Sequence, residues 1–205
     1  EFPKNIYEAI PEKIKELKQA HACLTKVSGD YKHPDIHNSP YNLYKAEKKD
    51  LAESIFKLVI DRSLKLMLSK DGDFELLFFP IGHDSHTGLM YLEYGKDILH
   101  DPLYQEIMRG LLEIYAGYKE DALLYESAKE FYEESGNIEK VKEMEQKMQN
   151  PNWEKDCENP PGTRIHTKQA WEQFKEKFAN YHVMSEDEIE QVVNSVDAEI
   201  VSLIA

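Results

Sequence analysis

The sequence predicts an all-α protein, a helical bundle made of antiparallel helix pairs. Apolar residues recur at helical spacing through most of the chain, and clusters of Gly, Pro, Asn and Asp separate these stretches. The segment 74–94 is too short and too aromatic to follow this pattern clearly. A small β-hairpin over 74–94 and a helix over 89–99 fit its residues equally well.

Composition and charge restrict the class of protein. The chain of 205 residues can bury a core without disulfides, and its 41% hydrophobic and 31% charged residues are typical of a folded, soluble protein. Its 25 basic and 39 acidic residues give a net charge of −14, which disfavours binding to nucleic acids and to anionic membranes. No apolar run approaches the roughly 20 residues of a membrane span, so no membrane insertion is expected.

The N-terminal part predicts two helices. The first covers about 8–27, and its regular part is expected to start at Pro11, because proline fits only the first turn. Ser39 and Pro40 form a cap and first position for a long second helix over 41–69. The second half of this helix is apolar over a wide arc, so we expect it to be the central, most buried helix.

Three further helices are expected in the middle of the chain. Asp101 and Pro102 form a cap and first turn for one of them. The next covers about 121–135, and Gly136 separates it from a shorter helix over 138–148. Short connections of this kind favour antiparallel neighbours.

The domain organisation follows from the prolines. We expect a helical main domain over 1–150, a proline-rich linker over 151–165 and a C-terminal helical hairpin over 166–205. Thr167 is expected to cap the first helix of the hairpin, and the segment 185–188 forms a capping box for the second.

The C-terminal hairpin carries a continuous apolar stripe that needs a cover. Two helices alone bury too little surface for independent stability, so the hairpin must dock on the main domain or on another chain. Docking on the main domain, binding to a protein partner, and a homodimer through the C-terminal helix all satisfy this need. The candidate partner-binding residues are Trp171, Phe174, Val192, Val196 and Ile200.

A repeat of about 34 residues is worth testing in a helical chain. The residues that recur in one frame are Ala128, Tyr132, Gly136 and Val141 in one copy and Tyr91, Tyr94, Gly95, Ile98, Ile107 and Leu111 in the other. With this spacing, 88–155 resembles two tetratricopeptide hairpins, which implies antiparallel helix pairs with tyrosine-rich faces. The pattern departs from that family at Lys129, where a small residue packs, and at Glu145, where an aromatic residue packs. No proline closes either repeat.

The densest set of potential metal ligands lies in and after the glycine-flanked segment 80–88. The candidate ligands are His83, Asp84, His86 and His100. Two histidines at this spacing can share a zinc, iron or manganese ion, and Asp97 could add an oxygen ligand. A bound water would then be the nucleophile of a hydrolase, with Glu93 as its general base. A polar loop without metal is the simpler interpretation, because the spacing matches no signature with a defined mechanism.

Cysteine usage bears on the compartment. Cys23 and Cys157 are far apart in the sequence and in no Cys-x-x-Cys motif, which predicts two free thiols in a reducing compartment such as the cytoplasm. The alternative is an exported mature form in which the two cysteines form a long-range disulfide.

The sequence contains no P-loop, dinucleotide-binding fingerprint or Gly-x-Ser-x-Gly elbow. We therefore expect an acidic, all-helical protein–protein interaction module that has no catalysis of its own, needs no cofactor and binds a protein partner. The alternative is a metal-dependent hydrolase of phosphoester or amide bonds that uses the histidine loop 83–86.

Overall fold

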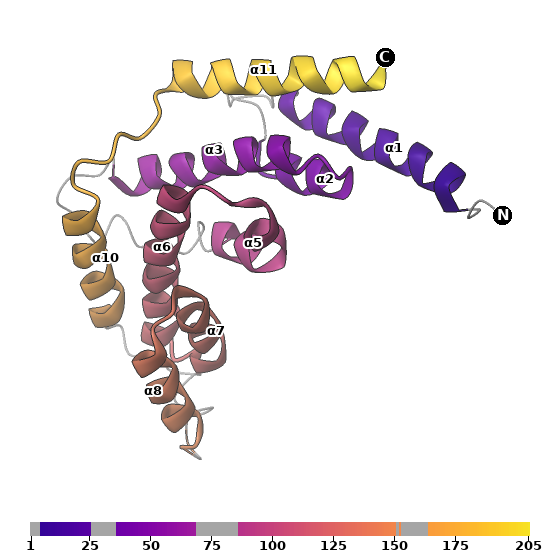
Figure 1. Cartoon of the computed structure of the whole chain (residues 1–205). Helices are drawn as coiled ribbons and strands as arrows, with labels where there is room; N and C mark the ends of the chain where they lie inside the picture. Colours follow the sequence, from indigo (N-terminus) through magenta and orange to yellow (C-terminus); the bar gives the residue numbers. More distant parts are fainter. Residues whose placement is uncertain (1–4, 26–35, 69–85, 151, 153–163) are drawn as a thin grey trace. The chain divides into compact units, whose positions relative to one another are not determined.

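The structure is a computed structural model. It describes residues 5–25, 36–68, 86–150, 152 and 164–205. Every regular element within these ranges is a helix, and none is a strand (Figure 1). The all-α class predicted from the sequence is therefore confirmed.

The chain forms two compact units. Unit 1 comprises Glu1–Arg62, Glu93–His100 and Val183–Ala205, and unit 2 comprises Ser63–Leu92 and Asp101–His182. The two helices of the expected C-terminal hairpin belong to different units, α10 (Ile165–Lys177) to unit 2 and α11 (Glu186–Ile204) to unit 1. The grouping into two units does not test the domain boundaries expected from the sequence, which remain a prediction.

In unit 1, α1 (Asn5–Thr25) packs against α2 (Ser39–Lys45) and α11. The helix begins before Pro11, so the prediction that its regular part starts at the proline is wrong. Pro11 lies early in the helix at an exposed position, where its missing N–H removes a single backbone hydrogen bond. Leu17 and Leu24 are buried on the stripe that the sequence indicates.

A break at residues 46–48 separates α2 from the next helix, so the prediction of one long helix over 41–69 is wrong. Glu47 adopts a left-handed conformation with a φ of 59°. The backbone N–H groups of Glu47 and of the following residue donate to the carbonyls of Tyr44 and Leu43, both at 2.9 Å. This is a Schellman motif, which apolar periodicity alone does not reveal when a glutamate occupies the left-handed position.

The helix after this break, α3 (Lys49–Leu68), buries a broad apolar arc, as predicted. Its buried apolar residues are Leu51, Ala52, Ile55, Phe56, Leu58, Val59, Ile60, Leu64 and Met67. Asp61 is also buried, and its carboxylate accepts the backbone N–H of Met184 at 3.0 Å. A buried carboxylate of this kind requires such a partner, so the bond fixes the approach to α11 within unit 1.

Residues 86–98 are helical, so the β-hairpin over 74–94 that the sequence allowed is wrong. Met90, Tyr94 and Ile98 are buried at helical spacing, whereas a strand would bury alternate residues. The first half of the expected hairpin lies outside the described residues. The rival expectation of a helix in this region agrees with the structure.

This helical stretch contains a π-helical turn, η1 (Tyr91–Gly95), before the short α5 (Lys96–Ile98). The turn places the ring of Tyr94 beside those of Tyr41, Tyr44 and Phe56, with centroids 5.5, 5.7 and 6.0 Å away. The hydroxyl of Tyr44 also donates to Asp97 at 2.9 Å. These contacts tie α2 and α3 to η1 and α5 within unit 1.

α11 starts at the predicted capping box. The backbone N–H of Ser185 donates to the carboxylate of Glu188 at 2.7 Å, and the backbone N–H of Glu188 donates to the Ser185 hydroxyl at 3.3 Å. Its buried stripe consists of Ile189, Val193, Val196 and Ile200. The helix packs on α1, where His21 Nδ1 lies 2.7 Å from a carboxylate oxygen of Asp197.

In unit 2, α6 (Pro102–Asp121) packs against both α7 (Tyr125–Ser135) and α10, and α7 packs against α8 (Ile138–Met148). Asp101 caps α6 as predicted, since its carboxylate accepts the backbone N–H of Leu103 at 3.0 Å. α6 is therefore the helix against which both α7 and α10 pack.

Left-handed residues end α6 and α7. Leu123 has a φ of 60°, and the connection delays the start of α7 to Tyr125, so the expected helix start at residue 121 is wrong. Gly136 has a φ of 84° and separates α7 from α8, as predicted.

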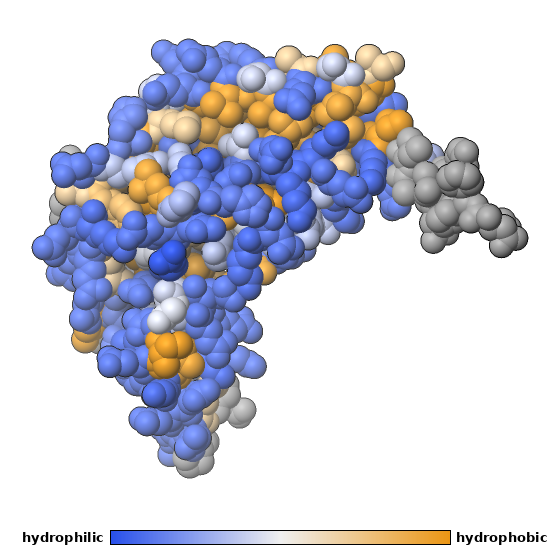
Figure 2. Space-filling model, viewed as in Figure 1, coloured by the Kyte–Doolittle hydropathy of each residue, from blue (hydrophilic) through white to orange (hydrophobic). Residues whose placement is uncertain are grey.

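Polar residues cover most of the face seen in Figure 2, and apolar residues gather along α11. Near the end of this helix, Val201 and Leu203 are 47% and 40% exposed. No helix in the described part of the chain combines the length and apolarity needed to cross a membrane.

We predict that Glu47→Gly is more stable than Glu47→Ala by about 1 kcal/mol. Both changes remove the carboxylate and its contact with Lys13, but only glycine relieves the left-handed conformation. Urea unfolding of the two variants measures the difference. Equal stability, or a more stable alanine variant, would contradict the strained conformation.

Candidate functional site at the carboxyl end of α6

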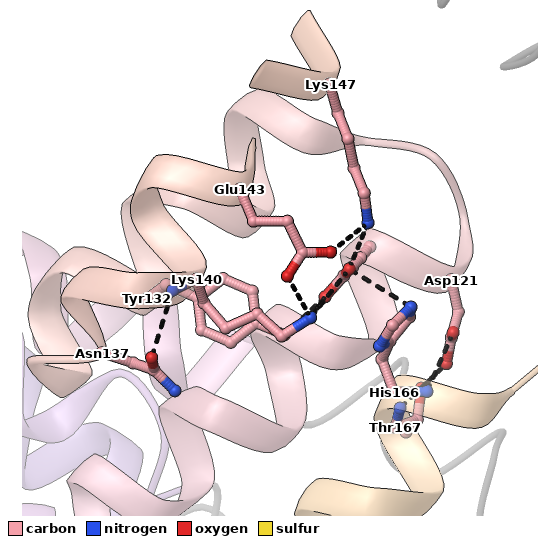
Figure 3. A network of polar contacts seen from close by, with 9 residues as sticks. Asp121, Tyr132, Asn137, Lys140, Glu143, Lys147, His166 and Thr167 are labelled. Carbon is pink, nitrogen blue, oxygen red and sulfur yellow. Dashed lines mark hydrogen bonds and ion pairs between the residues drawn. The ribbon is translucent and has the colours of Figure 1, made fainter. Parts of the chain in front are cut away.

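A dense polar network lies at the last turn of α6, around Glu120 and Asp121 (Figure 3). Both residues are buried, with 2% and 6% of their surface exposed. The carboxyl end of a helix disfavours negative charge, and burial disfavours it further. The two carboxylates must therefore obtain compensating partners from neighbouring helices.

The carboxylate of Glu120 has partners on three helices. The Tyr132 hydroxyl of α7 donates to it at 2.7 Å. From α8, the ammonium groups of Lys147 and Lys140 lie 2.6 and 3.2 Å away. From α10, His166 Nε2 lies 3.2 Å away. One buried side chain thus connects four helices of unit 2.

Glu143 completes the network from α8. Its carboxylate lies 2.8 Å from both Lys140 and Lys147. Burial alone would raise the pKa of Glu143, but hydrogen bonds and charges from the two lysines outweigh burial and lower it to about 2. The pKa of Tyr132 is raised, chiefly by burial and then by the charge of Glu120 and the hydrogen bond to it. Glu143 and Tyr132 thus keep the protonation states that the network needs at neutral pH.

Asp121 binds the amino end of α10. Its carboxylate accepts the backbone N–H groups of His166 and Thr167 at 3.1 and 2.9 Å and the Thr167 hydroxyl at 2.5 Å. The prediction that Thr167 caps its own helix is wrong, because α10 starts earlier, at Ile165, and Asp121 of α6 supplies the cap instead. A carboxylate in this position satisfies unpaired N–H groups and complements the helix dipole.

Two glycines of α6 allow α10 to approach closely. A Cβ on Gly117 would lie 2.8 Å from the backbone carbon of His166, and a Cβ on Gly110 would lie 2.6 Å from the ring of Phe174. Backbone at that distance cannot move aside without shifting the helix. Gly117 is thus required by the same contact that brings Asp121 to the end of α10.

The arrangement supports a structural role better than a catalytic one. Two negative side chains, Glu120 and Glu143, face two positive ones, Lys140 and Lys147, and each is bonded within the network. General acid–base catalysis needs a group that can reach a substrate proton, whereas the Glu120 side chain is 1% exposed. The network instead fixes the positions of α7, α8 and α10 on α6.

The predicted metal ligands are not brought together in the described structure. His86 and His100 are both exposed, and His83 and Asp84 lie outside the described residues. The backbone N–H of His100 donates to Glu53 at 2.7 Å. Among the residues that are described, no three His, Cys, Asp or Glu side chains gather as a metal site requires. The metal site stays a prediction.

The predicted partner-binding residues lie mostly inside the chain. Trp171 and Phe174 are 3% exposed, on the helix that packs against α6. Val196 and Ile200 are buried on the helix that packs against α1, and Val192 is half-buried. A partner can therefore reach the four buried residues, all except Val192, only if α10 or α11 moves.

The residues of the network were not found from the sequence. Glu120 continues an apolar stripe of α6 through Leu112 and Ala116, so an acidic residue at a core position was the available signal. Lys140, Glu143 and Lys147 share one face of α8 at helical spacing. The spacing of residues along the chain does not predict that Glu120 and Asp121 contact α10, because these contacts join residues that are distant in sequence.

Comparisons of the chain with protein-family models, with curated proteins and with solved structures found no match.

We predict that Glu120→Gln lowers the free energy of unfolding by about 3 kcal/mol, because it removes the buried negative charge against which the half-buried Lys140 and Lys147 lie. Glu143→Gln is the matched control: its side chain is 40% exposed, so the expected loss is about 1 kcal/mol or less. Urea unfolding of both variants measures the two losses. Equal losses would contradict the central place of Glu120.

The low pKa of Glu143 predicts how its contribution varies with pH. The folded-state pKa of about 2 lies below the ordinary value of 4.5. The ionised Glu143 therefore makes its full contribution to the free energy of unfolding above pH 4.5, and this contribution is lost as the pH falls towards 2. We expect the difference in melting temperature between wild type and Glu143→Gln to be constant near neutral pH and to shrink over this window. Circular dichroism melts at a series of pH values test this. A difference that persists undiminished below pH 2 would contradict it.

Proposed function

We propose that the protein is an acidic, all-helical protein–protein interaction module without catalysis of its own. The observation that carries the proposal is the network around Glu120, in which one buried carboxylate has partners on three other helices. Its charged groups are bonded to one another across four helices, and its central carboxylate, that of Glu120, is buried, which supports a structural role for the network. A module of this kind needs no cofactor.

The packing in unit 2 supports the same proposal. α6 packs against α7 and α7 against α8, and stacked helix pairs joined by short turns are an arrangement that commonly presents a binding surface. Exposed apolar side chains are present in this unit, with Ile138 58% and Ile165 63% exposed. The net charge of −14 favours a partner whose contact surface is basic or neutral.

The test combines partner capture with elemental analysis. The tagged chain is purified from its source cells, and co-purifying proteins are quantified against a tag-only control. We expect one protein in near-stoichiometric amount, whose separately purified form binds the chain in isothermal titration calorimetry. We also expect no stoichiometric zinc, iron or manganese.

The opposite result would favour a metal-dependent hydrolase acting through the histidine loop. It consists of a stoichiometric metal that is lost in His83→Ala and His86→Ala, together with metal-dependent hydrolysis of a phosphoester or amide. Glu93→Gln is then the informative variant, because it removes the expected general base without removing an expected ligand. That combination would overturn the interaction proposal.

A further inference from the structure

We propose that an aromatic cluster in unit 1 is a binding site for a small, neutral aromatic ligand that carries a hydrogen-bond acceptor. The rings of this cluster belong to Tyr41 and Tyr44 of α2, Phe56 of α3 and Tyr94 of η1. Such a site goes beyond the proposed function, because its ligand is a small molecule rather than a protein.

The first argument is the hydroxyl of Tyr94. The residue is 3% exposed, and no group in the described part of the chain forms a hydrogen bond with its hydroxyl oxygen. An unpaired buried hydroxyl costs free energy, and native proteins satisfy most such groups. A π-helical turn places Tyr94 there, and this rare conformation is frequent at functional sites. The hydroxyl is therefore a donor for an acceptor that a ligand supplies.

The second argument is the packing of the rings. The ring centroid of Tyr94 lies 5.5, 5.7 and 6.0 Å from the centroids of the other three, which are distances of rings in contact. Phe56 is fully buried, and the Tyr44 hydroxyl donates to Asp97 at 2.9 Å. Tyr41, by contrast, is 36% exposed. Tyr41 is thus the ring that can turn outward, and an aromatic ligand in its place would keep the contact with Tyr94.

The third argument is charge, which restricts the acceptor to a neutral group. Burial raises the pKa of Tyr94, and the charge of Glu93 and the nearby Tyr41 raise it further, so the hydroxyl stays protonated and can donate. The negative charge of the exposed Glu93 also repels an anionic acceptor. The ammonium of Lys45 lies 5.1 Å from the ring centroid of Tyr41 and would favour another aromatic ring in that position. An aromatic amide, which accepts through its carbonyl oxygen, meets these conditions.

The test titrates the full-length chain with benzamide, and with toluene, which lacks the acceptor, while NMR follows the backbone amide shifts. We expect benzamide to shift the signals of residues 41–44 and 94–97 and to leave those of α10 unchanged. Tyr94→Phe removes only the hydroxyl. We expect this variant to bind benzamide about fivefold more weakly, as the loss of one neutral hydrogen bond implies, and to bind toluene as the wild type does.

Tyr41→Ala tests whether Tyr41 covers the site. We expect it to bind benzamide more tightly than the wild type, because the ligand no longer displaces a ring. Tyr118→Ala is the matched control, since it removes another half-buried tyrosine that lies under a lysine ammonium, and we expect unchanged binding.

The wild type and Tyr94→Phe keep the test decisive if circular dichroism shows that Tyr41→Ala folds poorly. Absence of benzamide shifts in the wild type would overturn the proposal, and so would equal benzamide affinity of the wild type and Tyr94→Phe. A folded Tyr41→Ala variant that binds benzamide no better than Tyr118→Ala would also contradict it. Capture of a protein partner is measured separately, so the proposed function stands or fails independently of these results.

Discussion

Two adjacent buried carboxylates at the carboxyl end of α6, Glu120 and Asp121, are the constraint on which unit 2 depends. Burial and the helix dipole both oppose negative charge at this position. The helices that follow in the sequence remove this penalty, α7 with a hydroxyl, α8 with two ammonium groups and α10 with an imidazole and its first N–H groups. If any one of the three helices moved away, the carboxylates would lose the hydrogen bonds or charge partners that this helix supplies.

In unit 2, the interactions that stabilise the fold differ from those that set the register of the helices. Apolar residues such as Ile107, Leu111 and Phe131 supply the driving force for packing, but apolar surfaces tolerate several registers. Buried ion pairs add little net stability compared with apolar packing, yet an incorrect register would leave them unpaired. We infer that Glu120 and Asp121 select one position for each neighbour, and that the glycines of α6 select how closely α10 approaches.

The sequence predicts those parts of the fold that depend on local rules. The all-α class, the cap at Asp101, the break at Gly136 and the capping box at Ser185 follow from side chains within one turn of the feature. The errors have a common cause, in that contacts or conformations outside the local pattern decide the outcome. Glu47 takes a left-handed conformation usually left to glycine, and the cap of α10 comes from a residue 45 positions earlier than the N–H of His166. For the site, the sequence directed attention to histidines, whereas the structure directs it to an acidic residue at a core position.

The central claim is that the carboxylates of α6 hold α10 in place. Amide hydrogen exchange of the wild type and of Asp121→Asn, followed by mass spectrometry, tests it most directly, because exchange reports the opening of individual helices. The account predicts faster exchange across α10, Ile165–Lys177, in the variant, with α11 unchanged as the internal control. Equal protection of α10 in both proteins would contradict the account and would assign the docking of this helix to apolar packing alone.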